Sequence, residues 1–279
     1  MNNPVFESML SHYEVATKEE RQNATHEVMQ QIALAGLYRS GFFNRAAFYG
    51  GACLRFFHGS PQFSEDLDFS LLQADEYFCL ENYFDAITTE FRAFGLDITI
   101  ARKEKKTQTL AEPALGKDTT EIYILQFTTE RNVKIKIKVD TQPPAGFTAE
   151  YKLLMLPFSF MVRCYALSDS YARQMHAFLF RECENRVKGR DWYDFEWYVR
   201  NNIALNFEYL QQKMEQLNAI APHDFSVEHF KSRLKERILN TNMNAMKNDV
   251  CPFLKNPAEI DIWSCDYFLQ LVDRIILNG

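Results

Sequence analysis

The chain has 279 residues, of which 47% are hydrophobic and 24% are charged. This composition is typical of a globular protein with one large domain or two small ones, and it excludes the disordered and fibrous classes. The formal net charge of −6 gives no general attraction to nucleic acid, although a local basic patch could still bind it. The sequence has no run of about 18 apolar residues, so we expect no transmembrane helix.

The six cysteines are scattered and show no CxxC spacing. The N-terminal stretch MNNPVFESMLSHYEV lacks the basic, apolar and small-residue segments of a secretory signal peptide. These two features predict reduced thiols and a cytoplasmic location.

Residues 5–47 are predicted to be helical, because apolar side chains recur there every three to four positions. These side chains are Val28, Ile32, Leu34, Leu37 and Phe42. Thr17 is the expected N-cap, since its hydroxyl can reach free amides and Glu20 stands three places on.

The chain then alternates between short elements. After Gly50 and Gly51, ACLRFFHG predicts a short helix ended by Gly59, and LDFSLL (67–72) predicts a strand. Residues 76–95 predict an amphipathic helix stopped by Gly95, followed by strands over 96–103, 121–129 and 132–141. This order of helix, strand, helix and three strands indicates an α+β fold.

The rest of the chain is predicted to be almost entirely helical from about Ser168. The expected helices cover 169–188, 190–202, 206–220, 226–240 and 258–277. We therefore expect an α/β core with N-terminal helices over 1–165 and a helical C-terminal domain over 166–279. The two parts are expected to pack firmly together, because no flexible linker rich in Pro, Gly or Ser separates them.

Two carboxylates flank one leucine in the strand that follows the glycines. Because side chains alternate along a strand, Asp66 and Asp68 share one face, while Leu67 and Phe69 point into the opposite, apolar face. Two like charges side by side are unfavourable unless a cation lies between them. A divalent metal is the functional interpretation, and a strand face that is merely solvated is the plain alternative.

The strand NVKIKIKVDT offers a third carboxylate. Its alternation sends Ile135, Ile137 and Val139 to the core and Asp140 to the other face. If this strand neighbours that of Asp66 and Asp68, three carboxylates suit Mg²⁺, a hard cation that also binds substrate phosphates. The lysines Lys134, Lys136 and Lys138 lie on the face of Asp140 and could steer phosphates, unless they only protect a strand edge.

Three segments together resemble a known family. GGACLRFFHG, FSEDLDFSL and RVKGRDWYDFEWYV are similar to the AbiEii/AbiGii branch of the polymerase-β-type nucleotidyltransferase superfamily. The resemblance covers most of the chain from about Phe48 to Tyr198. It implies a mixed sheet with helices, followed by a mostly helical C-terminal part.

The same resemblance implies a function. Members of this branch are toxins of bacterial toxin–antitoxin and phage-defence systems, which transfer a nucleoside monophosphate from an NTP to an acceptor. The implied cofactor is Mg²⁺ or Mn²⁺, the expected acceptor is the 3′ end of tRNA, and a cognate antitoxin is an expected partner. No membrane partner is expected.

The resemblance also assigns roles to residues of this sequence. Asp66, Asp68 and Asp140 would hold the metal, and Asp191 would be an essential acid on a helix. The residues expected to bind the nucleotide are Gly50, Gly51, Ser64, Lys188 and Arg190. Asp194 lies on the same helix face as Asp191.

At two positions this sequence departs from the family. Gln62 and Gln174 stand where the family usually has arginine and lysine, and Lys188, Arg173 or Arg190 could supply the missing charge. These departures motivate an alternative, a pseudoenzyme that binds NTP or a partner protein without transferring anything. A third hypothesis with the same metal chemistry is phosphoryl transfer to a protein partner.

Other reactive or aromatic side chains are more simply explained by packing. Cys53, His58 and His176 show no spacing typical of a catalytic or zinc site. The aromatic run on the segment 190–202 is expected to be core. Its members are Trp192, Tyr193, Phe195, Trp197 and Tyr198. Lys103, Lys105 and Lys106 are expected to be a solvated strand end or hairpin edge.

Overall fold

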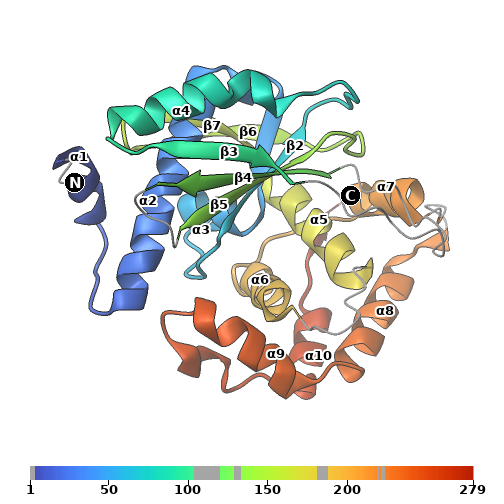
Figure 1. The fold of residues 1–279 in the computed structure, drawn as a ribbon. Helices are drawn as coiled ribbons and strands as arrows, with labels where there is room; N and C mark the ends of the chain where they lie inside the picture. Colours follow the sequence, from blue (N-terminus) through green and yellow to red (C-terminus); the bar gives the residue numbers. More distant parts are fainter. Residues whose placement is uncertain are drawn as a thin grey trace.

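The computed structural model describes residues 4–103, 120–128, 133–180, 188–218, 220 and 224–278. A seven-stranded mixed sheet forms the centre of the first half, and helices dominate the second half (Figure 1). The predicted α+β fold class is therefore confirmed. The predicted lysines Lys105 and Lys106 lie outside the described residues, as does Cys183.

The sheet places the carboxylate strand near its middle. Its order is β3 (Ile98–Arg102), β4 (Thr120–Phe127), β5 (Lys134–Asp140), β2 (Asp66–Leu71), β1 (Ala46–Tyr49), β7 (Phe160–Tyr165) and β6 (Ala149–Leu154). Strand β2 pairs in parallel with β5 and antiparallel with β1. The strands of Asp66 and of Asp140 are therefore neighbours, as the metal hypothesis requires.

One face of the sheet is covered by the N-terminal helices. These are α1 (Pro4–Leu10), α2 (Lys18–Arg39), α3 (Gly50–His58) and α4 (Phe84–Ala93). Residues of α2 such as Val28 and Ile32 pack in one cluster with Leu67 of β2 and Ile137 of β5. This apolar contact stabilises that half, since each buried aliphatic side chain contributes about 1.5–3 kcal/mol.

Local signals at the helix ends act as predicted. The Thr17 side chain accepts from the amide of Glu20, whose carboxylate accepts in turn from the Thr17 amide, so the capping box is present. Gly59 closes α3 in the left-handed conformation at φ 73°. Gly95, at φ 73°, follows the end of α4.

The predicted helix over 5–47 is wrong at its C-terminal end. The helix α2 stops at Arg39, a 3₁₀ turn η1 spans Phe42–Asn44, and Ala46–Tyr49 forms the strand β1. Strand β1 lies between β2 and β7, and its buried residues Ala46 and Phe48 fill the core. Pairing with β2 on one side and β7 on the other makes this short apolar segment a strand. Its hydrophobic periodicity alone cannot distinguish a strand from a helix.

The structure differs from the prediction at two further places, before the C-terminal helices and at the start of the helix predicted over 76–95. Strands β6 and β7 occupy residues before the C-terminal helices to which we assigned no helix or strand. The predicted helix over 76–95 begins later, with a 3₁₀ turn η2 at Leu80–Tyr83 followed by α4.

Helices α5 to α10 follow β7. Their bounds are α5 (Leu167–Phe180), α6 (Gly189–Arg200), α7 (Phe207–Asn218), α8 (Val227–Leu239), α9 (Met243–Val250) and α10 (Cys265–Asp273). Two 3₁₀ turns, η4 (Cys251–Phe253) and η5 (Pro257–Ile260), precede α10, so the predicted continuous helix over 258–277 is wrong. The short strands β8 (Leu205–Asn206) and β9 (Leu277–Asn278) pair in parallel.

These helices have their own apolar cluster. It contains the aromatic run of α6, including Trp192 and Phe195, together with Phe178 and Phe268. In Figure 1, α6, α8, α9 and α10 lie below the sheet and α4 lies above it. A backbone hydrogen bond of 3.1 Å from Phe63 to the Phe253 carbonyl joins η4 to the loop before β2. The division at 165/166 stays a prediction.

The cysteines and the hydropathy of the helices agree with the expectations. The described cysteines Cys53, Cys79, Cys164, Cys251 and Cys265 are free thiols. Across the described ranges, no helix combines the length and the apolar character that crossing a membrane requires.

Candidate active site

The pair Asp66 and Asp68 lies on the sheet face turned away from α2. Leu67 and Phe69 between and after them are fully buried on the opposite face. In the parallel register with β5, Asp66 stands opposite Lys136 and Asp68 opposite Lys138. The predicted alternation is confirmed, and directly opposite residues share a face, so lysines line this side of the carboxylates.

The two glycines bring the start of α3 against this pair. Gly50 has φ +81°, and a Cβ there would lie 3.0 Å from Asp68 Oδ2. A Cβ on Gly51 would lie 3.1 Å from the Ser64 hydroxyl oxygen. The absence of side chains at both positions therefore lets the first turn of α3 approach Asp68 and Ser64. First-turn amides of a helix favour bound anions.

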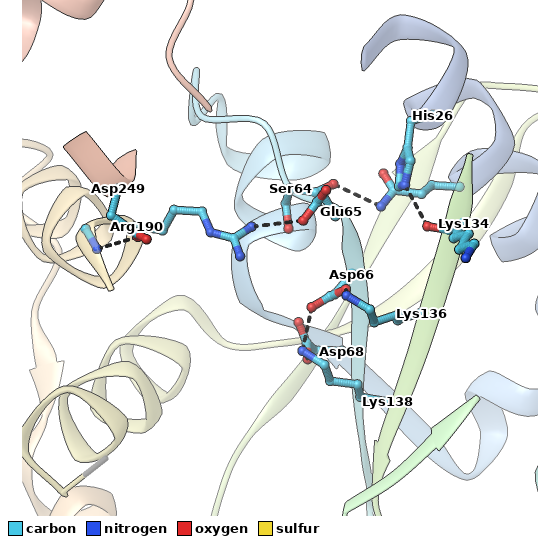
Figure 2. A network of polar contacts seen from close by, with 12 residues as sticks. His26, Ser64, Glu65, Asp66, Asp68, Lys134, Lys136, Lys138, Arg190 and Asp249 are labelled. Carbon is cyan, nitrogen blue, oxygen red and sulfur yellow. Dashed lines mark hydrogen bonds and ion pairs between the residues drawn. The ribbon is translucent and has the colours of Figure 1, made fainter. Parts of the chain in front are cut away.

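A lysine ammonium lies between the two carboxylates. Lys138 Nζ is 2.6 Å from Asp66 Oδ2 and 3.4 Å from Asp68 Oδ1, and Lys136 Nζ is 3.6 Å from Asp66 Oδ1 (Figure 2). Burial alone would raise the pKa of Asp66, but Lys138 and Lys136 outweigh it and hold that pKa below its ordinary value. Burial, together with the charge of Asp66, keeps the pKa of Asp68 raised despite Lys138.

These residues fit a divalent cation. The Lys138 ammonium is a positive charge that lies close to both carboxylates. A metal ion at the same place would also neutralise their two negative charges. Asp66 Oδ1 is buried and makes no hydrogen bond in the described part of the chain, and Lys136 Nζ lies 3.6 Å from it, so this oxygen could serve as a ligand. Hard oxygen donors of this kind suit Mg²⁺ or Mn²⁺.

Asp140 lies further along the same face but in another environment. Its partner across the sheet is Ser70, and its carboxylate accepts a 2.8 Å hydrogen bond from Arg173 Nη2 of α5. In the described ranges, no three side chains of His, Cys, Asp or Glu converge as a metal site would need. The structure therefore brings Asp66 and Asp68 together and holds Asp140 on Arg173.

Arg173 anchors α5 to the sheet. Its Nη2 also donates to the Tyr49 hydroxyl at 2.8 Å, and its guanidinium lies 4.1 Å from the centre of the Tyr49 ring. Its Nη1 is buried and has no hydrogen-bond partner among the described residues. Sequence reasoning named Arg173 only as a substitute cation, because its pairing with Asp140 links residues 33 positions apart.

The N-terminal end of α6 supplies the remaining predicted residues. Asp191 Oδ1 accepts a 3.3 Å hydrogen bond from Gln174 Nε2 of α5. Arg190 Nη1 lies 3.9 Å from Glu65 Oε2, beside the carboxylate strand (Figure 2). The Arg190 guanidinium also lies over the Phe253 ring, 4.3 Å from its centre. Lys188 is exposed just before the helix. Asp249 accepts from the amide of Gly189 at 2.9 Å and holds this end of α6 in place.

Asp194 is a buried carboxyl on the same helix. Its Oδ1 lacks a hydrogen-bond partner in the described ranges, and burial, assisted by Asp191, raises its pKa well above the ordinary value. The charge of Asp68 on β2 also raises the pKa of Asp194, whereas Arg190 lowers it. A carboxyl with such a shift beside a candidate site is itself a functional candidate.

Sequence reasoning missed Lys213 of α7. Its side chain is 3% exposed, and burial and Arg173 lower its pKa well below the ordinary value, against the opposing charge of Asp140. The sequence offers one signal, a lysine among the apolar positions Leu210 and Met214 of an amphipathic helix.

The side chains that we assigned to packing are found there. Cys53 is 3% exposed within the N-terminal core. The aromatic run of α6 is buried in the C-terminal cluster. His176 stacks on Phe180, and His58 is half-buried on α3.

Comparison with known proteins places most of the chain in one family. The family described as "Nucleotidyl transferase AbiEii toxin, Type IV TA system" matches residues 32–271. No curated protein sequence matches the chain.

Two solved structures with TM-scores of 0.50 and 0.51 share the fold. A Helicobacter pylori protein assigned as a nucleotidyltransferase aligns at a TM-score of 0.51 and 16% identity, over 92% of each chain. JHP933 from H. pylori aligns at 0.50 and 16%, over 92% of this chain and 90% of its own. MenT4, a nucleotidyltransferase toxin from Mycobacterium tuberculosis, aligns at 0.48 and 14%, over 98% and 99%. Because the family match spans most of the sequence, this chain belongs to the AbiEii nucleotidyltransferase toxin family of type IV toxin–antitoxin systems.

Proposed function

We propose that this chain transfers a nucleoside monophosphate from an NTP to the 3′ end of a tRNA in the cytoplasm, with a divalent metal at Asp66 and Asp68. The arrangement of β2 against the first turn of α3 carries the proposal. It joins two carboxylates to a helix start that two glycines keep open. An NTP needs both features, since its phosphates bring charge and its metal needs oxygen ligands.

The residues divide into two groups in this proposal. Asp66 and Asp68 hold the metal, which supplies neutralisation of the charge that develops on the phosphates. Asp140 is the third proposed ligand. To bind the metal, its carboxylate would have to release the hydrogen bond from Arg173. The amides of Gly50 and Gly51 and the hydroxyl of Ser64 receive the phosphates, and Lys188 and Arg190 approach from α6. Asp191 is the proposed acid on that helix.

Lysines of β5 support an RNA acceptor. Lys134, Lys136 and Lys138 follow one another on the carboxylate face, and Lys134 is exposed. Cations at this spacing attract a phosphate backbone even though the net charge of the chain is −6. The family also implies a cognate antitoxin as regulator. This part of the proposal rests on the family alone.

The test uses the purified chain with Mg²⁺, total tRNA and each of the four NTPs labelled at the α-phosphate. The label stays with the transferred nucleotide, so labelled tRNA reports the reaction and identifies the base. Asp66→Asn should abolish labelling, because it removes the charge and leaves the shape. Asp85→Asn, an exposed position at the start of α4, is the matched control and should label like the wild type.

A pseudoenzyme is the second candidate. The bond from Gln174 to Asp191 favours it, because a neutral amide stands where the family usually has a cation. It predicts Mg²⁺-dependent NTP binding in calorimetry with no labelled product. Gln174→Lys would then restore labelling if the missing cation is the reason. Labelling by the unmodified chain would refute this candidate, and labelling retained by Asp66→Asn would refute the metal assignment.

A further inference from the structure

Strand β6 forms one end of the seven-stranded sheet. It pairs with β7 through six consecutive residues, from Ala149 opposite Tyr165 to Leu154 opposite Phe160. The pairing has no bulge, so β6 presents a regular row of backbone groups at its outer edge. Such an edge is a template for another strand where no proline or bulge interrupts it.

One face of this edge is apolar and exposed. Tyr151 is 50% exposed and Leu153 53%, and both alternate onto the face of Met161 on β7, which is 40% exposed. Met155, immediately after the strand, is 61% exposed. Arg163 of β7 stacks over the Tyr151 ring at 4.9 Å and holds the ring against the sheet. Contiguous exposed apolar side chains of this kind mark an interaction surface.

The other face of β6 carries two opposite charges. Glu150 and Lys152 form an ion pair of 2.8 Å along the strand. If two copies of β6 pair with each other, the position of the twofold axis decides which side chains lie opposite each other. Opposite charges and apolar side chains meet in only one of these registers.

In an antiparallel pair, directly opposite residues share a face, so a twofold axis between two identical strands must pass through one residue position. An axis at Glu150 places two glutamates opposite each other, and an axis at Lys152 places two lysines opposite each other. An axis at Tyr151 places Glu150 opposite Lys152 of the partner subunit, twice by symmetry. It also aligns five of the six β6 residues, from Ala149 to Leu153, with their symmetry mates.

We propose that β6 binds a second copy of this chain, with the two strands antiparallel about a twofold axis at Tyr151. The sheet then continues from one subunit into the other. The backbone edge supplies the hydrogen bonds, the rings at Tyr151 and the side chain of Leu153 bury each other, and the charges fix the register. This surface is at the end of the sheet opposite to β3 and is independent of the proposed nucleotidyl transfer.

Charge reversal tests the register. In sedimentation velocity over a concentration series, the wild type should dimerise, and Lys152→Glu should raise the dissociation constant by about tenfold or more, because two glutamates then meet across the axis twice. Glu150→Lys should do the same. The double variant Glu150→Lys, Lys152→Glu restores complementarity and should dimerise like the wild type. Lys18→Glu, an exposed position on α2, is the control for the change in net charge and should have no effect.

A cysteine probe gives a readout that does not depend on affinity. In the proposed register, Tyr151→Cys faces its own symmetry mate and should form a disulfide-linked dimer on mild oxidation, whereas Glu150→Cys should not. The wild type, with its native thiols, is run beside them on a non-reducing gel. A wild type that stays monomeric at all concentrations overturns the proposal. So does a dimer that ignores both charge reversals and does not crosslink at position 151.

Discussion

Gly50→Ala tests whether the start of α3 is shaped to admit Asp68. The backbone there has φ +81°, a conformation that costs an alanine about 1–2 kcal/mol relative to glycine. The new Cβ would also lie 3.0 Å from Asp68 Oδ2, so that carboxylate has to move by a few tenths of an ångström. The variant combines backbone strain with displacement of a proposed metal ligand.

Gly59 separates the two effects. It has φ +73°, but a Cβ there meets nothing within 4 Å. Gly59→Ala should therefore lose about 1–2 kcal/mol of stability in urea unfolding and keep its rate of nucleotidyl transfer. Gly50→Ala should lose at least as much stability and, in addition, about tenfold or more of its transfer rate, because small misplacements of catalytic groups are costly.

Urea unfolding and the α-labelled NTP assay measure both quantities on the same preparations. Wild-type transfer by Gly50→Ala would refute the close approach of α3 to the carboxylates. Equal loss of transfer in Gly59→Ala would show that general instability, and not Asp68, accounts for the effect.

Three further changes probe the packing around the site. Arg173→Gln leaves the Asp140 carboxylate buried without its cation, so it should lower the free energy of unfolding in urea by about 3 kcal/mol. The double variant with Asp140→Asn should recover part of this loss. No recovery would contradict the ion pair. The raised pKa of Asp194 means that the folded chain keeps a proton that the unfolded chain releases above about pH 4. Stability should therefore fall as pH rises from there toward that raised pKa, and Asp194→Asn should remove the slope in thermal unfolding measured across pH; an unchanged slope would contradict it. Gly36→Ala places a Cβ 2.7 Å from the Ile87 backbone of α4. It should destabilise the fold by about 1–3 kcal/mol, although alanine has the better helix propensity. A stabilised variant would show that α2 and α4 separate easily.

Some predictions depended on short-range physics and were confirmed. The alternation of Asp66 and Leu67 holds because a strand has a side-chain period of two wherever it lies. The Thr17 cap and the Gly59 stop hold because each satisfies backbone groups within one turn. The resemblance to the family was read from the same kind of local signal, short motifs at fixed spacing, and the match over residues 32–271 shows the family.

Predictions failed where pairing partners are distant in sequence. Ala46–Tyr49 has too few residues for periodicity to identify it, and β2 and β7 on its two sides make it a strand. The strands β6 and β7 were missed for the same reason, since their charged, aromatic and apolar side chains alternate only partly. Hydrogen bonding across the sheet outweighed the weak preferences of these segments.

The sequence by itself determined the α+β class, the carboxylate pair on one strand face, and the glycines before it. Tertiary structure alone decided what those groups meet: Lys138 reaches Asp66 across 72 positions, and Arg173 donates a hydrogen bond to Asp140. It also decided the burial of Asp194 and Lys213, which shifts their pKa values in opposite senses. Spacing along the chain specifies a side chain's face, whereas charge and burial depend on neighbours that only the folded chain brings within a few ångströms.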